Sequence, residues 1–115
     1  MTDKEIIDKL KTDYPQIANA YQEIVKEQFL LFAKKMLDYG VDNIAMGTRL
    51  ETPEEKTLSL TAIWIRCNDK MNRLKNLVLF NKKNQVDGEV SIDSYMDLVN
   101  YNIIAQIVHK DLWKR

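Results

Sequence analysis

Two aspartates, Asp93 and Asp97, have the spacing in this sequence that most suggests chemistry. They lie four residues apart within residues 88–108, a segment so rich in apolar side chains that it predicts a helix with neighbours on several sides. Asn100 falls on the same face of this helix, and Glu89 joins it if the helix begins early. Carboxylates are seldom buried unless they are paired or bind a metal. This polar stripe therefore faces either water or a site.

A row of cations, Arg66, Lys70 and Arg73, follows helical spacing in an earlier segment. Guanidinium and ammonium groups donate well to phosphate oxygens, and aspartates suit magnesium, which keeps waters and substrate phosphates among its ligands. With Asp93 and Asp97 the row would form a site for a magnesium-complexed nucleotide. Ordinary roles also fit, because aspartates near a helix N-terminus favour the helix dipole and long cations extend into water.

Four further residues are weaker candidates. Glu27 is a candidate metal ligand, although an exposed helix face explains it better. Trp64, Tyr39 and Tyr101 could stack on a base, and packing alone also accounts for each of them.

Nucleophilic catalysis is poorly supported by the sequence. The single histidine, His109, lies near the end of the chain, and the single cysteine, Cys67, falls in an apolar stripe. One cysteine and one histidine do not make a zinc site at ordinary spacings, and no strand–glycine–helix phosphate loop is present.

Four helices are predicted to position these residues. Thr2 and Glu5 cap a short helix through about residue 11, and a long helix with Pro15 in its first turn runs to Tyr39, where Gly40 ends it. Thr52-Pro53-Glu54-Glu55 is a strong start for a third helix that reaches about residue 80, and the apolar segment forms the last helix. The longest irregular segment, residues 41–51, is of a length that is often functional.

Two apolar stripes define the expected core. On the second helix the stripe comprises Tyr21, Val25, Phe29, Phe32, Ala33 and Met36. On the third helix it comprises Leu60, Ile63, Trp64, Cys67, Met71, Leu74 and Val78. We therefore expect an all-α fold, a compact bundle of three long helices plus a short N-terminal helix, in one domain spanning residues 1–115.

Composition narrows the function classes. The chain has 115 residues, 45% of them hydrophobic and 30% charged, with 3 glycines and 2 prolines, which fits a helical domain better than a disordered or all-β one. Its formal net charge of zero disfavours recruitment of DNA or an anionic membrane. A lone cysteine and a charged N-terminus without the apolar run of a signal peptide predict a cytoplasmic protein.

Three segments resemble the nucleotide modification associated domain 1 family, a small helical domain common in phages and some bacteria. They are Leu31–Gly40, Ile63–Leu74 and Tyr95–Ile104, in the order that the family has them, and they span most of the chain. The resemblance implies a link to phage nucleotide or modified-base metabolism. It singles out Lys35, Asp38, Tyr39, Gly40, Lys70, Arg73, Asp97, Asn100 and Tyr101. The place of Lys35 and Asp38 suggests that this helix end and residues 41–51 form one wall of a pocket.

The chain is more distantly similar to all-α nucleoside triphosphate pyrophosphatases of the MazG type, which bind magnesium through helix-borne acidic motifs. It departs from them because Asp93 and Asp97 are four residues apart rather than three, and because no Glu-Glu-x-x-Glu motif precedes them. The departure weakens the case for hydrolysis more than the case for nucleotide binding.

Three functions remain. The first is magnesium-dependent hydrolysis of a (deoxy)nucleoside triphosphate, with Asp93 and Asp97 holding the metal, helped by Glu27 or Asp38, and with Lys35, Lys70 and Arg73 neutralising phosphate charge. The second is nucleotide binding without chemistry, as a carrier or as a sponge for a host signalling nucleotide. The third is a structural domain without a small ligand. The apolar last helix makes a homo-oligomer plausible under any of them.

Overall fold

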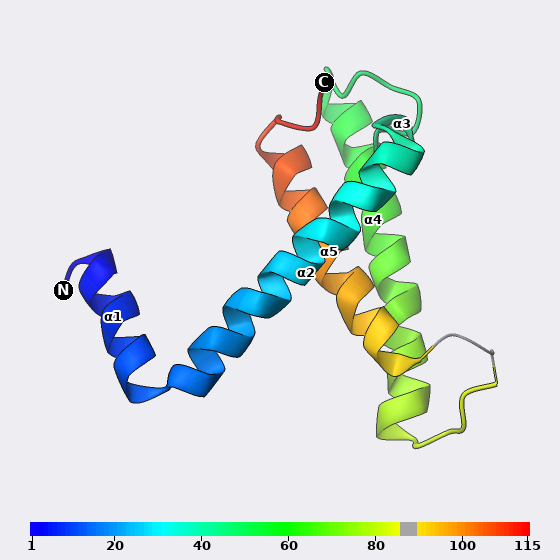
Figure 1. Ribbon diagram of the computed structural model, residues 1–115. Coiled ribbons are helices and arrows are strands. Elements are labelled where there is room, and N and C mark those ends of the chain that lie inside the picture. The colour runs from blue at the N-terminus through cyan, green and yellow to red at the C-terminus, as the bar shows by residue number, and fades with distance from the viewer. Residues whose placement is uncertain (86–89) are drawn as a thin grey trace. The chain divides into compact units, whose positions relative to one another are not determined.

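The computed structural model describes residues 1–85 and 90–115, and across these residues all regular structure is helical (Figure 1). The elements are α1 (Asp3–Asp13), α2 (Pro15–Tyr39), α3 (Asp42–Ala45), α4 (Pro53–Leu74), a π-helical turn η1 (Lys75–Leu79) and α5 (Ser91–His109). The all-α prediction is confirmed. Glu89, assigned above to the polar stripe, and residues 86–88 lie outside the described residues. Within the described part, none of the helices combines the length and hydrophobicity that a bilayer crossing requires.

The helix ends follow local sequence signals. Thr52 Oγ1 accepts from the Glu55 backbone N–H at 3.1 Å, and the Glu55 carboxylate accepts from the Thr52 N–H at 3.0 Å, which is the predicted capping box. Gly40 has φ +71° and its N–H donates to Met36 O at 2.9 Å, so it ends α2 in the left-handed conformation that glycine tolerates. The third helix was expected to reach about residue 80, but α4 ends at Leu74 and the π-helical turn η1 continues to Leu79.

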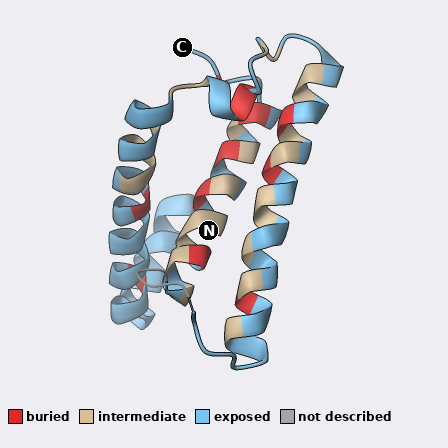
Figure 2. Ribbon diagram, turned by 90° about the vertical axis from the view of Figure 1, so that its right-hand side faces the viewer, coloured by how far each residue is buried: buried red, intermediate tan, exposed pale blue. Residues whose placement is uncertain are grey.

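The contacts within the chain divide it into two units, residues 1–34 and residues 35–115, and α2 contributes to both. In the second unit α4 and α5 run antiparallel, side by side, and α3 packs on α4 (Figure 1). Ser59 on α4 donates its buried hydroxyl to Ile44 O of α3 at 2.6 Å. The Trp113 indole N–H donates to Val41 O at 3.0 Å and fixes the segment after α5. Figure 2 shows buried positions on α3, α4 and α5. The apolar core of this unit consists of Ile44, Ala45, Ile63, Leu74, Ile104 and Val108 from these helices, with Trp113 from the segment after α5.

The expected core stripe of α4 is partly wrong. Ile63 and Leu74 are buried, but Trp64, Met71 and Val78 are exposed. The cause is the row of cations, which occupies the side of α4 that faces α5 and leaves the neighbouring apolar side chains turned outward.

The expectation that α5 is covered on several sides is also wrong. Its Ile92, Tyr95, Val99 and Ile103 are exposed, because α5 packs on α4 along one side. An apolar circumference therefore did not indicate how many neighbours the helix has.

The first unit contains α1 and most of α2. No residue of α1 is buried, and Tyr21, Val25 and Phe29 of the expected α2 stripe are exposed. In this unit α2 buries Ala18 and Gln28, and two helical segments are too few to enclose a larger core. In α1 the charged side chains pair locally, with Lys4 Nζ 2.6 Å from Asp8 Oδ2 and Lys9 Nζ 2.9 Å from Asp13 Oδ2.

Candidate functional site

Asp97 lies between two lysines on different helices. Lys35, in the last turns of α2, places its Nζ 3.1 Å from Asp97 Oδ1, and Lys70 of α4 places its Nζ 2.9 Å from Asp97 Oδ2. The Asp97 side chain is 16% exposed, against 49% for Lys35 and 34% for Lys70. We name these three residues the Asp97 cluster. In this cluster one carboxylate accepts from two ammonium groups.

Opposing effects set the pKa of Asp97. Partial burial raises the pKa, but hydrogen bonds from Lys70 and Lys35 and the charges of both lysines lower it by more, so the pKa lies below the ordinary value for an aspartate. Asp97 is therefore an anion at neutral pH, held by two cations.

The other cations of the row also contact α5. The Arg66 guanidinium lies 6.0 Å from the centre of the Tyr101 ring, and Arg73 Nη1 donates to Ser94 Oγ at 2.9 Å. Because the two helices are antiparallel, residues later on α4 contact residues earlier on α5. The row thus fastens α4 to α5 along its length.

Arg66 and Arg73 also reach the backbone of neighbouring segments. Arg66 Nη2 donates to Asn43 O at 3.1 Å, and Arg73 Nη1 to Val90 O at 3.1 Å. The row therefore lies along the aspartate stripe, and the two pair directly at Lys70 and Asp97.

Asp93 has a capping role at the start of α5. Its Oδ2 accepts from the Val90 N–H at 3.3 Å. Within residues 1–85 and 90–115 no group of three or more histidine, cysteine, aspartate or glutamate side chains is placed to hold a metal ion. Glu27 belongs to the first unit and Asp93 and Asp97 to the second. The magnesium site stays a prediction.

The remaining predicted site residues differ in exposure. Asn100 is buried on α5, whereas Asp38 and Tyr39 are exposed at the end of α2. Cys67 is half-buried and burial raises the pKa of its thiol, which disfavours the reactive thiolate. The structure brings together Lys35, Lys70 and Asp97, with Arg66, Tyr101 and Arg73 along the same helix pair.

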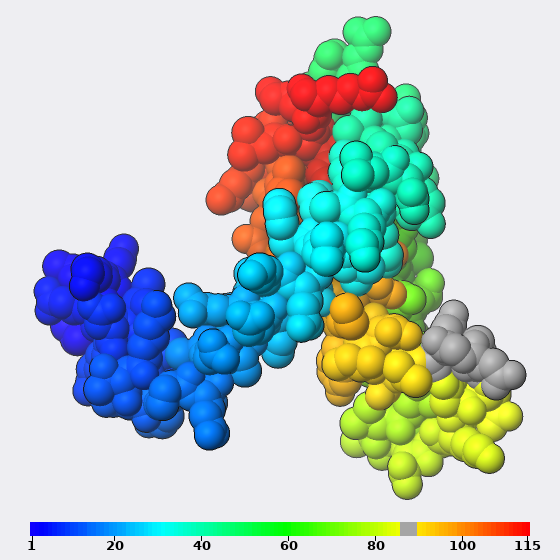
Figure 3. Space-filling view, viewed as in Figure 1, coloured from blue at the N-terminus to red at the C-terminus, as the bar shows by residue number. Residues whose placement is uncertain are grey.

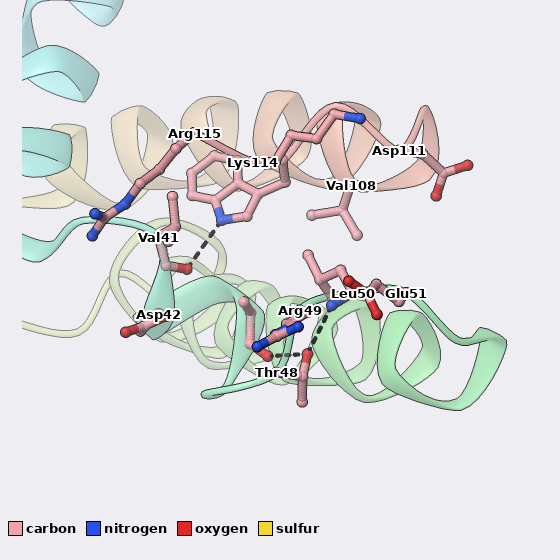
Figure 4. A pocket seen from close by; sticks show the side chains of 12 residues that line it. Val41, Asp42, Thr48, Arg49, Leu50, Glu51, Val108, Asp111, Lys114 and Arg115 are labelled. Atoms are coloured by element: carbon pink, nitrogen blue, oxygen red, sulfur yellow. Dashed lines mark hydrogen bonds between the residues drawn. The ribbon is translucent and has the colours of Figure 1, made fainter.

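The sequence reasoning missed part of a pocket. This pocket, about 650 Å³ in volume, lies between residues 41–51 and the segment after α5 (Figure 4). Figure 3 shows that C-terminal segment lying against the residues that follow α2. The residues that line the pocket are Val41, Asp42, Ala45, Thr48, Arg49, Leu50, Glu51, Val108, Asp111, Trp113, Lys114 and Arg115. Residues 41–51 were expected to form a pocket wall, but no signal in the sequence paired them with Trp113.

Comparison with known proteins adds no relative: no family model, no curated protein and no solved structure matches the chain. The resemblance to the nucleotide modification associated domain 1 family therefore rests on the sequence segments alone.

Proposed function

We propose that this protein binds a nucleotide or a related phosphorylated small molecule at the Asp97 cluster. The observation that carries the proposal is the pair of lysines on one carboxylate. Their ammonium groups come from different helices and remain partly exposed. Asp97 holds both ammonium groups in place before a ligand arrives, and such preorganisation lowers the entropy cost of binding.

Binding without hydrolysis fits the arrangement better than the magnesium mechanism. Both Asp97 oxygens accept from lysines, and Asp93 caps the start of its helix. A magnesium ion at Asp97 would have to displace two ammonium groups and would lie next to their positive charge. As arranged, the donors do not fit this ion, and we derive no hydrolytic step from them.

The proposal extends to the helix arrangement, the location and the assembly of the protein. The three long helices would form the predicted bundle through α4, α5 and the last turns of α2. We further propose a cytoplasmic location, since Cys67 is a free thiol, and association into a homo-oligomer.

A ligand pool tests this function. The purified protein is mixed, with and without magnesium, with nucleotides and cyclic dinucleotides, each at the concentration of the protein. The mixture is filtered before and after heat denaturation, and mass spectrometry measures the ligands in each filtrate. We expect one species to be lost from the filtrate and recovered intact after heating. Conversion of a triphosphate to its monophosphate would overturn binding without hydrolysis, and an untouched pool would overturn the nucleotide proposal.

Three variants locate the site. Lys35→Ala should weaken binding of the recovered ligand about tenfold or more, because a charge-assisted hydrogen bond to phosphate is lost. Lys34→Ala, an exposed lysine one residue away, is the matched control and should bind as the wild type does. Asp97→Asn separates the two mechanisms: if the lysines hold phosphate, binding should be weakened but remain measurable, because the lysines lose the anion that positions them, and if Asp97 holds magnesium, turnover should be abolished.

A further inference from the structure

The first unit presents a row of large apolar side chains along one face of α2. They are Ile17, Tyr21, Ile24, Val25 and Phe29, and we name them the α2 row. At about 100° per residue they occupy one contiguous arc of the helix. All five are more than half exposed, and Tyr21 and Phe29 reach 70%. Ala18 and Gln28 fall within the same arc and are buried, so the exposed row lies on a face of α2 that is partly covered.

The size of the row is that of a protein interface. Side chains of these types, exposed to this degree, present on the order of 600 Å² of mostly apolar surface. The largest apolar patch on an ordinary monomer is about 300–600 Å². Two such rows in contact would bury on the order of 1,200 Å², the lower end of the range for specific interfaces.

Charge indicates the chemistry of the partner. Residues 1–34 carry six carboxylates (Asp3, Glu5, Asp8, Asp13, Glu23, Glu27) and five lysines (Lys4, Lys9, Lys11, Lys26, Lys34), in alternating short runs. A nearly neutral, mixed surface neither attracts a polyanion nor repels a copy of itself.

The shape of the row suits a two-fold contact. Beside Tyr21 and Phe29 lies a shallow, largely open hollow, lined by these two residues with Gln22, Val25 and Lys26. A contact of this symmetry requires that one surface supply both the projection and the recess. The α2 row supplies both.

From exposure, area, charge and shape we propose that the α2 row is the interface through which a second copy of this chain binds, giving a two-fold homodimer. The inference deepens the homo-oligomer proposed above by naming its interface, and it does not depend on ligand binding at the Asp97 cluster, because all the residues that support it belong to the first unit.

Sedimentation velocity over a range of protein concentrations tests the interface. The wild type should pass from monomer to dimer. Tyr21→Glu should weaken dimerisation by about a hundredfold or more, because a carboxylate would have to be buried in an apolar contact. Leu30→Glu is the matched control: Leu30 is also apolar and exposed but lies on the opposite side of α2, so this variant should dimerise as the wild type does.

Three results would overturn the proposal. A wild type that stays monomeric would show that the row is covered in another way, for example by other residues of the same chain. Undiminished dimerisation of Tyr21→Glu, or an equal loss in Leu30→Glu, would place the interface elsewhere. Circular dichroism of both variants above the dimerisation range shows whether α2 is still helical, and a Phe29→Gln variant repeats the test without adding a charge.

Discussion

The two units of this chain differ in what holds their helices. In residues 35–115 side chains bind across long stretches of sequence, as in Trp113 to Val41 and Lys35 to Asp97. In α1 of residues 1–34 the ion pairs join residues four positions apart, and no residue of that helix is buried. The contrast shows that similar amphipathic patterns can lead to a packed core or to an uncovered face.

The difference bears on function. The second unit contains a preorganised charge cluster and its own core, so it has what a ligand site needs. The first unit has a large exposed apolar face and buries Ala18 as its one apolar residue, so it has what an association surface needs. The two proposals thus place ligand binding and self-association in separate parts of the chain.

The largest expected effect comes from removing one isoleucine in each unit. Ile63→Ala should lower the free energy of unfolding by about 2–5 kcal/mol, because it leaves a cavity in the core of the second unit. Ile24→Ala, the same change on the exposed α2 row, should cost less than about 1 kcal/mol at protein concentrations where the chain is monomeric. Urea denaturation of both variants measures this difference. Equal losses would show that the first unit has a core of its own and would break the contrast.

The next largest loss of stability is expected from removing one buried hydrogen bond between α4 and α3. Ser59→Ala should cost about 1–3 kcal/mol, because the buried Ile44 carbonyl loses the hydroxyl that donates to it. Thr57→Ala, an exposed hydroxyl on the same helix, should change the unfolding free energy by no more than about 0.5 kcal/mol. If the two variants are equally stable, the link between α3 and α4 contributes little to the second unit.

The sequence predicted the features that depend on a few adjacent residues. Thr52 with Glu55 marked the start of α4, and Gly40 marked the end of α2, since each signal acts through local hydrogen bonds or backbone conformation. The meeting of the α4 cations with the α5 aspartate stripe was also expected, although as a metal and phosphate site and not as direct pairing.

The features that depend on distant neighbours could not be predicted. Trp64 and Tyr95 satisfy the pattern of a core stripe, yet which apolar arc is covered depends on where the next helix packs. The pocket that Trp113 lines lies between residues 41–51 and the segment after α5, and no spacing rule connects positions so far apart.

The smallest expected effect is a dependence of stability on pH. Because the pKa of Asp97 is lower in the folded chain than its ordinary value of about 4, Asp97 stabilises the fold above that value, and this contribution is lost as the pH falls through the folded pKa. Asp97→Asn should therefore cost about 1 kcal/mol at neutral pH, a size typical of partly exposed ion pairs, and the difference from the wild type should shrink below about pH 4. Unfolding free energies measured across this range, with Asp69→Asn on the exposed side of α4 as the control, test the assignment. A cost that does not change with pH would mean that the amide disturbs packing, and that the two lysines do not depend on the charge of Asp97.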